Sequence, residues 1–297
     1  MDWGKSRRSD NVVEDSGGGS YGGGGGRRFS GGGRIGLGGI VLVIIVSLLL
    51  GKNPLEVLSV LSGGADTQTA SQSDNPAPAP AGNDPQTDFV RAILGSTEDV
   101  WTDVFQKAGS RYTAPRMVLF HNGVRTACGA AESAVGPFYC AGDRQVYLDT
   151  GFFQEMDTQL KASGDFARAY VIAHEVGHHV QNLLGTFEQV GQAQRRGAAV
   201  EGADGLSVRQ ELQADCYAGV WANVAQQRLQ WLQAGDVESG MNAASAVGDD
   251  RLQKQARGYV VPDSFTHGTS AQRVRWFRAG FDSGNIAQCD TFRARML

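Results

Sequence analysis

The sequence lacks a marked excess of charge of either sign, with 27 Lys and Arg residues against 31 Asp and Glu residues. A general nucleic-acid-binding protein carries a strongly basic surface, so we expect no nucleic-acid partner. The 41 glycines follow no Gly-X-Y period, which excludes a collagen. Because 41% of the residues are hydrophobic and 8% are aromatic, the chain has enough apolar surface for a folded core.

Aliphatic side chains are almost missing from residues 1–34, where Gly and Ser dominate. Such a segment buries too little apolar surface to offset the conformational entropy that it would lose on folding. The composition therefore predicts a disordered, glycine-rich tail over residues 1–34.

Charge is missing altogether from residues 35–51, which are mostly Ile, Leu, Val and Gly. About 17 apolar residues is the lower limit for a helix that crosses a lipid bilayer. A cleaved signal peptide would end in small residues of the Ala-x-Ala kind, which do not occur here. A core helix would need amphipathic neighbours, whereas both flanks are polar. We therefore expect residues 35–51 to form a transmembrane helix.

Basic residues lie mainly before this apolar run, and only Lys52 follows it closely. The preceding ones are Lys5, Arg7, Arg8, Arg27, Arg28 and Arg34. Basic flanks of a membrane span remain in the cytoplasm. We therefore expect a single-pass protein of the cell membrane, with a cytoplasmic N-terminus and the rest of the chain in the periplasm or outside the cell.

Residues 52–88 begin with a short apolar patch at 55–61 and continue with small and polar residues, Ala and Pro, which predicts a flexible tether. The remaining residues, 89–297, number about 200 and suit one folded domain. Hydrophobic periodicity and cap signals predict a helix-rich α+β domain. The expected helices are 88–107, 152–160, 166–184, 207–232, 236–257 and 271–280, and the expected strands are 116–121 and 145–149. Gly185 is expected to cap the end of the third helix, Ser207 with Gln210 to form a capping box at the start of the fourth, and Thr269 or Ser270 to cap the last.

The four cysteines all fall in this domain, at Cys128, Cys140, Cys216 and Cys289. An even number outside the cytoplasm favours disulfides, and the Cys-x-x-Cys spacing of many zinc sites is missing. Four cysteines permit three pairings. Cys128 and Cys140 enclose a short Gly-containing stretch and are the favoured pair, in which case Cys216 and Cys289 would tie a central helix to the C-terminal region.

The clearest chemical signal is the sequence His-Glu-x-x-His from His174 to His178. On a helix these two histidines lie one turn apart on the same face, so both can bind one metal ion. Glu175 lies beside them and can take a proton from a metal-bound water molecule. A structural histidine cluster is the alternative. Gly177 costs about 1 kcal/mol relative to Ala inside a helix, which indicates close backbone packing near the metal.

A catalytic zinc ion usually has a third protein ligand and an open fourth position. Glu211 and Asp215 lie on one face of the expected 207–232 helix, where Glu211 can bind the metal and Asp215 can accept the second N–H of a ligand histidine. Apolar neighbours indicate burial, in which case the acids need a partner; on an exposed face they would be solvated charges. His179 competes as a ligand but points about 100° away from His178.

These motifs resemble the zincin metallopeptidases whose third zinc ligand is Glu, and more closely the bacterial family of neutral zinc metallopeptidases. The matching stretches are 136–140, 146–149, 173–181, 211–219, 267–269 and 272–277, and the resemblance covers most of residues 89–292. It implies a zincin-like α+β fold, Zn²⁺ bound by His174, His178 and Glu211, and Glu175 as the general base. Manganese or cobalt can occupy the same ligand set.

The function that the resemblance implies is hydrolysis of peptide bonds in a peptide or protein substrate by a membrane-anchored zinc metallopeptidase. The oxyanion needs a further donor, and our candidate is His267, in a Gly-containing loop just before an expected helix. Tyr217 and Tyr259 are alternatives, and a capping or packing histidine is the simpler explanation. The competing function is a non-catalytic, zinc-stabilised binding module at the membrane surface, which has no need for Glu175.

Overall fold

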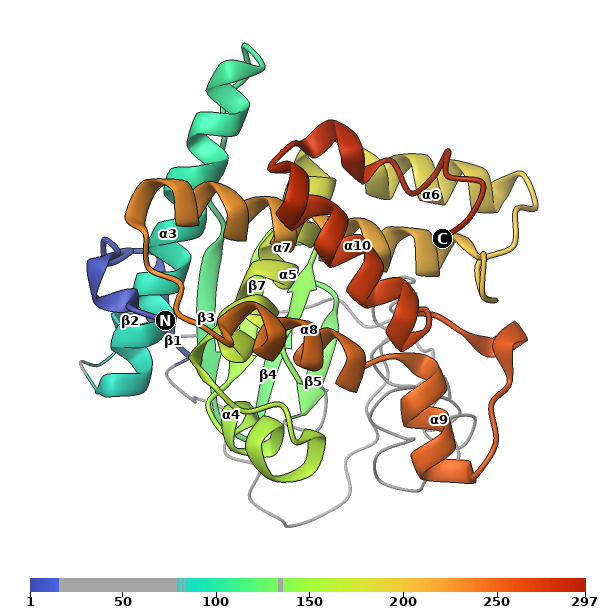
Figure 1. The fold of residues 1–297 in the computed structure, drawn as a ribbon, viewed down its shortest axis with the longest axis horizontal. Coiled ribbons are helices and arrows are strands. Elements are labelled where there is room, and N and C mark those ends of the chain that lie inside the picture. The colour runs from blue at the N-terminus through green and yellow to red at the C-terminus, as the bar shows by residue number, and fades with distance from the viewer. Residues whose placement is uncertain (16–78, 81, 83, 133–135) are drawn as a thin grey trace, which may run out of the picture.

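The computed structural model describes residues 1–15, 79–80, 82, 84–132 and 136–297. These residues form a helix-rich α+β fold in which helices pack against a small sheet (Figure 1). The expected span 35–51 and most of the expected tether 52–88 lie outside the described residues. In the part that is described, every helix is too short or too polar to cross a membrane.

The main sheet has five strands in the order β2-β1-β3-β7-β6. Their bounds are β1 (Val12–Glu14), β2 (Ala79–Pro80), β3 (Arg116–Phe120), β6 (Phe138–Cys140) and β7 (Gln145–Asp149). The central strands β1, β3 and β7 are parallel, whereas β2 and β6 pair antiparallel at the two edges. Strands β4 (Gly123–Thr126) and β5 (Gly129–Glu132) form a separate hairpin.

The two strands predicted from the sequence are confirmed as β3 and β7. Both are buried over nearly their whole length, which is why they stand out as apolar runs. The other strands were not predicted, because each has only two to four residues and carries little apolar alternation.

Eight helices of the described residues surround this sheet. They are α3 (Pro85–Lys107), α4 (Phe152–Glu155), α5 (Asp165–Leu183), α6 (Thr186–Arg195), α7 (Leu206–Leu229), α8 (Asp236–Ala246), α9 (Asp249–Arg257) and α10 (Ser270–Ser283). Helix α5 packs against β6, β7, α3, α7 and α8, so it occupies the centre of the fold. A continuous apolar core joins these helices to the sheet, and its largest fully buried side chains include Trp101, Phe166 and Trp221.

Two helix ends are as predicted. Gly185 follows α5 with a φ of 80°, which is the left-handed conformation of a C-terminal glycine cap. Thr269 caps α10, where its side chain accepts from the backbone N–H of Gln272 and the Gln272 side chain accepts from the backbone N–H of Thr269. This reciprocal pair is a complete capping box.

Two other helix predictions are wrong. Ser207 does not cap α7; Gly205 is the N-cap residue, and the carbonyls of Ala199 and Val200 accept the N–H groups of Leu206 and Ser207. The expected 236–257 helix is broken into α8 and α9, because the chain passes so close to Ser270 at position 248 that only a glycine fits there.

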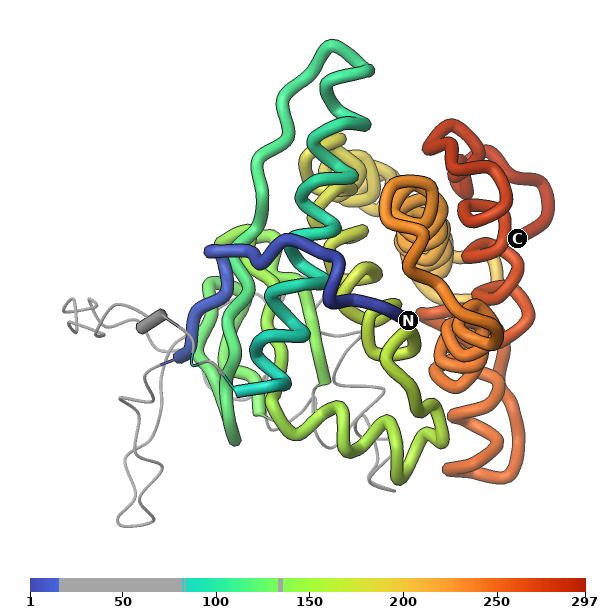
Figure 2. Tube along the Cα trace, turned by 60° about the vertical axis from the view of Figure 1, so that its left-hand side comes forward, coloured from blue at the N-terminus to red at the C-terminus, as the bar shows by residue number. Residues whose placement is uncertain are grey.

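Residues 1–15 correct the prediction of a disordered tail over 1–34. Strand β1 lies inside the sheet, and the segment before it runs alongside α3 (Figure 2). The folded unit is therefore larger than residues 89–297, since it includes residues 1–15 and α3 begins at Pro85. The composition did not predict this order, because the segment is held mainly by ion pairs and hydrogen bonds rather than by buried apolar surface. Residues 16–34 lie outside the described part.

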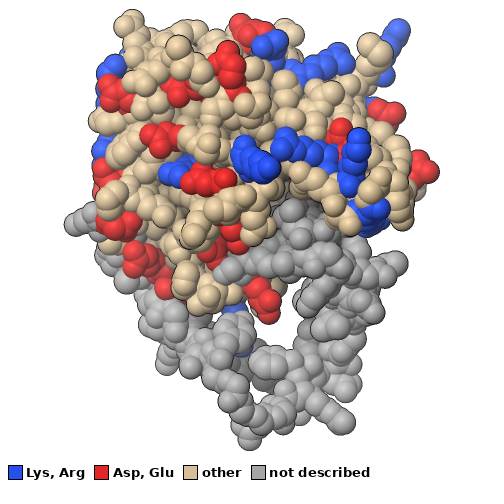
Figure 3. Space-filling view, turned by 60° about the horizontal axis from the view of Figure 1, so that its bottom comes forward, with Lys and Arg blue, Asp and Glu red and all other residues tan. Residues whose placement is uncertain are grey.

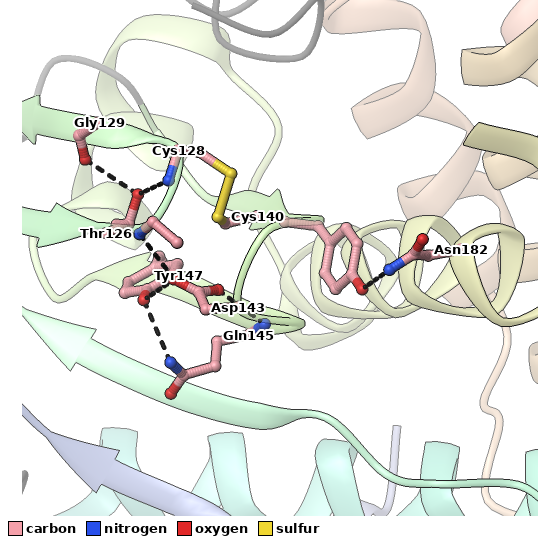
Figure 4. The surroundings of a disulfide bond; sticks show 10 residues. Thr126, Cys128, Gly129, Cys140, Asp143, Gln145, Tyr147 and Asn182 are labelled. Carbon is pink, nitrogen blue, oxygen red and sulfur yellow. Dashed lines mark hydrogen bonds between the residues drawn. A yellow bond between two sulfur atoms is a disulfide. The ribbon is translucent and has the colours of Figure 1, made fainter. Parts of the chain in front are cut away.

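The predicted disulfide pairing is confirmed. Cys128 is bonded to Cys140, which joins β6 to the turn between β4 and β5 (Figure 4). Cys216 is bonded to Cys289, which joins α7 to the short helix η5 (Ile286–Cys289) near the C-terminus.

The molecular surface carries charges of both signs. On the face in Figure 3, basic and acidic side chains both occur over the part that is coloured. This agrees with the nearly balanced composition, and the absence of a nucleic-acid partner stays a prediction.

Candidate metal centre

Helices α5 and α7 approach each other closely at Gly177. A Cβ atom at this position would lie 3.0 Å from the carbonyl oxygen of Ala214 and 3.2 Å from its Cα. Glu211 lies about one helical turn before Ala214, so this close approach brings its carboxylate to the face of α5 that carries His174 and His178. The predicted close backbone packing at Gly177 is confirmed.

His174, His178 and Glu211 offer three ligand atoms that all lie within 4.8 Å of one another. The Nε2 atom of His174 is 3.1 Å from Glu211 Oε2, and the Nε2 atom of His178 is 3.5 Å from Glu211 Oε1. The histidine side chains are only 8% and 11% exposed and that of Glu211 is 12% exposed. The three residues that the sequence singled out as ligands are therefore brought together in one nearly buried group.

The ring of His174 is oriented by Asp215, which is fully buried. His174 donates from Nδ1 to Asp215 Oδ1 at 2.8 Å, so its Nε2 atom faces Glu211. Burial favours the neutral acid, but the charge of Arg273 and that of His174 lower the pKa of Asp215 to about 2. Burial also opposes a charged His174, yet Asp215 raises the pKa of this ring to about 9.

Arg273 and Tyr170 complete the surroundings of Asp215. The Arg273 guanidinium donates from Nε and Nη2 to the two carboxylate oxygens at 2.8 and 2.9 Å, and the Tyr170 hydroxyl donates to Oδ1. Arg273 is only 3% exposed, so the pair is a buried salt bridge. No local pattern predicts either role, because Tyr170 and Arg273 meet Asp215 only through the packing of α5, α7 and α10.

The ring of His178 is oriented by Gln181, another residue that sequence reasoning missed. Nδ1 of His178 donates to Gln181 Oε1 at 2.9 Å. The direction of the Gln181 amide is fixed because its Nε2 donates to the Gln210 carbonyl at 2.7 Å and to Gln213 Oε1 at 3.0 Å. The position of Gln181, one turn after His178 on the same helix face, is a signal that could have identified it.

The donor set fits a divalent cation. Each histidine has its Nδ1 atom engaged elsewhere, so both Nε2 atoms face the Glu211 carboxylate and, as neutral imidazoles, would share one cation with it. Burial opposes ionisation of Glu211, yet the charges of His178 and His267 hold its pKa well below its usual value. Two imidazole nitrogens and one carboxylate are the ligands of many catalytic zinc sites.

Glu175 lies between the two ligand histidines in the sequence and is 8% exposed. Burial raises the pKa of its carboxyl group, while the charges of His178 and His174 oppose that rise. The side chain therefore belongs to the same enclosed group as the ligands.

His179 points away from the ligand cluster, as its helical angle predicts. Its Nε2 donates to the Thr113 carbonyl at 2.7 Å, and its Nδ1 lies 3.2 Å from the Tyr139 hydroxyl. Burial lowers the pKa of His179, so the ring is a neutral link between α5, β6 and the chain before β3.

His267 lies in a buried loop that Asp249 holds in place. One oxygen of Asp249 accepts the backbone N–H groups of Thr266, His267 and Gly268 at 2.7, 2.6 and 3.0 Å. The ring is only 4% exposed, and its charge acts on Glu211. It is thus near the ligand cluster but not a member of it.

The two tyrosine alternatives to His267 differ in exposure. Tyr259 is 61% exposed, whereas Tyr217 is buried with its ring against Trp101. Within the described residues, neither tyrosine makes a hydrogen bond to His174, His178 or Glu211.

A helix-borne histidine pair joined by a glutamate from a second helix defines a candidate metal centre of the zinc-hydrolase type. The chain belongs to the family described as "Putative neutral zinc metallopeptidase", whose model matches residues 1–292. The match begins at residue 1, so the resemblance extends well beyond the 89–292 region that the motifs indicated.

Two relatives illustrate the extent of the similarity. The uncharacterized protein YpfJ of Escherichia coli K12 is 48% identical over 292 residues, which cover 98% of this chain and 99% of that protein. The uncharacterized protein Rv2575 of Mycobacterium tuberculosis H37Rv is 47% identical over 219 residues, which cover 70% of this chain and 73% of that protein. No solved structure matches this chain.

Proposed function

We propose that this protein is a zinc-dependent metallopeptidase of zincin-like fold that hydrolyses peptide bonds. The observation that carries the proposal is the orientation of the two histidines, whose Nδ1 atoms donate to Asp215 and Gln181 so that both Nε2 atoms face Glu211. His174, His178 and Glu211 would hold the metal. A purely structural site would need no additional buried acid, so Glu175 favours catalysis.

A peptide substrate is supported by the edge strand β6. Within the described residues β6 is an edge strand, which is the kind of strand that an extended peptide can extend by pairing. Tyr139 of β6 accepts a hydrogen bond from Asn182 of α5 at 2.8 Å, and Cys140 is held by its disulfide (Figure 4). This edge is therefore fixed beside the helix that carries the ligands.

The reaction that we propose is attack of water on the scissile carbonyl. Zinc, when bound, supplies a Lewis acid that polarises the carbonyl and lowers the pKa of water. Glu175 accepts the proton of the attacking water and delivers it to the leaving amine. His267 is our candidate donor to the developing oxyanion, and Asp249 fixes the backbone of its loop.

The decisive experiment compares the wild-type protein with Glu175→Gln on an unfolded protein substrate. We expect equal zinc content in both proteins and a loss of about 100-fold or more in the rate of cleavage, because the general base is removed while the ligands remain. Equal residual activity in both, or no cleavage by the zinc-loaded wild type, would favour the non-catalytic binding module instead.

A further inference from the structure

The N-terminal segment is bound to α3 around one buried carboxylate. Glu98 is 6% exposed and accepts hydrogen bonds from three residues of the segment. Arg7 Nη2 donates to Oε2 at 2.6 Å, while Ser9 Oγ and Asn11 Nδ2 donate to Oε1 at 2.6 and 2.7 Å. Without the segment, the nearly buried carboxylate of Glu98 would lose these three donors, which is energetically costly. The environment of Glu98 therefore favours binding of the segment.

A second charge pair, formed by Arg8 and Asp88, lies beside the contacts of Glu98. Arg8 donates from Nε and Nη2 to the two oxygens of Asp88 at 2.7 and 2.8 Å, which is a bidentate pair. This contact lowers the pKa of Asp88. Trp3 packs edge-on against Phe89, and its indole N–H donates to Asp165 at 3.2 Å.

The backbone contacts are equally specific. A Cβ atom at Gly95 of α3 would collide with the carbonyl oxygen of Arg7, so the segment approaches the helix at a position where only glycine fits. Beyond it, the Met117 N–H donates to the Asn11 carbonyl at 2.9 Å and the Asp15 N–H donates to the Leu119 carbonyl at 2.8 Å. These bonds tie β1 to β3 as part of the sheet.

We propose that residues 1–15 and the candidate metal centre lie on the same side of the cell membrane, outside the cytoplasm. A bilayer core is about 30 Å thick, so contacts at hydrogen-bond distance cannot be made across it. The two disulfides of this folded unit place it in an oxidising compartment.

This proposal replaces the single-pass orientation expected from the basic residues before residues 35–51. Arg7 and Arg8 belong to that set, but both are ion-paired with acids of α3. Lys5 likewise donates to the Gln230 carbonyl at 3.0 Å. Basic residues that are bound to the folded unit cannot also hold the N-terminus in the cytoplasm. Three of the six basic residues that suggested the single-pass orientation are therefore no evidence for it.

Thiol labelling in the full-length protein tests this placement without reference to enzymatic activity. Asp10→Cys reports on the N-terminal segment and Ser110→Cys on the domain; both native residues are exposed. A membrane-impermeant maleimide is applied to cells with an intact cytoplasmic membrane. We expect equal labelling of both thiols. Labelling of the Ser110→Cys variant alone would overturn the same-side placement, and labelling of both only after permeabilisation would overturn the external placement.

A second measurement tests the contact itself. Gly95→Ala introduces a methyl group against the Arg7 carbonyl, whereas Gly191→Ala in α6 meets only the flexible end of Arg195 at 3.4 Å. We expect Gly95→Ala to lower the Tm of the full-length protein by about 5 °C or more and Gly191→Ala to leave it nearly unchanged. Equal Tm values for Gly95→Ala and the wild type would show that residues 1–15 are not bound to α3.

Discussion

At the scale of single residues, Asp215 organises the surroundings of the ligand His174. It accepts from His174, Tyr170 and Arg273 at once and so links α5, α7 and α10 at one carboxylate. The sequence predicted its contact with a ligand histidine because Asp215 lies one turn from Glu211. Tyr170 and Arg273 could not be predicted in this way, because they meet Asp215 only through the packing of α5, α7 and α10.

We expect Asp215→Asn to weaken zinc binding by about 10- to 100-fold, which is typical when the partner of a ligand histidine is changed. The amide removes the charge that holds the Nδ1 proton of His174 and leaves Arg273 buried without its counter-ion. Competition with a chromogenic chelator measures the affinity. Asp282→Asn, at an exposed position of α10, is the matched control, and equal affinities in the two variants would contradict this role of Asp215.

At the scale of helices and strands, the predictions are correct where a hydrophobic pattern repeats. They are wrong where a single close backbone contact determines the end of a helix. Helices α3, α5 and α10 have long periodic stretches and clear caps, so their prediction is nearly complete. The start of α7 and the break before α9 depend on backbone approaches at Gly205 and Gly248, which involve residues that no local pattern reveals.

Gly177 makes a prediction at this scale. Gly177→Ala would place a methyl group 3.0 Å from the Ala214 carbonyl, so α5 and α7 must move apart by a few tenths of an ångström. We expect a loss of about 1–3 kcal/mol in the free energy of unfolding and weaker zinc binding, because Glu211 moves with α7. Urea unfolding and metal titration measure the two effects. The control is again Gly191→Ala, and a Gly177→Ala protein as stable as this control would contradict the close approach.

The N-terminal cap of α3 gives a pH-dependent prediction. Asp84 accepts from the N–H groups of Gln86 and Thr87 and from the Thr87 hydroxyl, and these bonds lower its pKa below the usual 3.8. A lowered folded-state pKa contributes stability that is present above about pH 3.8 and disappears as the pH falls through the folded value. We therefore expect the stability difference between wild type and Asp84→Asn to shrink as the pH is lowered below 4. A constant difference from pH 6 to pH 3 would contradict the ionised cap.

At the scale of the whole molecule, the fold joins segments that are far apart in the sequence. The helix-rich α+β class and the ligand triad were predictable because both are encoded in local periodicity. The inclusion of residues 1–15 in the fold was not predictable. The contacts of Glu98, Asp88 and Gly95 with this segment are visible only in the folded structure. Composition alone indicates how much apolar surface a segment can bury. It does not indicate the hydrogen bonds and ion pairs that the segment makes with α3.

The metal centre is also expected to stabilise the whole fold, because its ligands come from two helices that pack in the core. A ligand that binds only the folded state at 100 times its Kd adds about 2.7 kcal/mol to the free energy of unfolding. We therefore expect zinc to raise the Tm of the chelator-treated protein and EDTA to reverse the rise. His174→Ala should abolish the zinc-dependent shift, whereas Glu175→Gln should retain it, because Glu175 is not a ligand. A shift that survives in His174→Ala would mean that zinc acts on another site, and loss of the shift in Glu175→Gln would make Glu175 a ligand rather than the base.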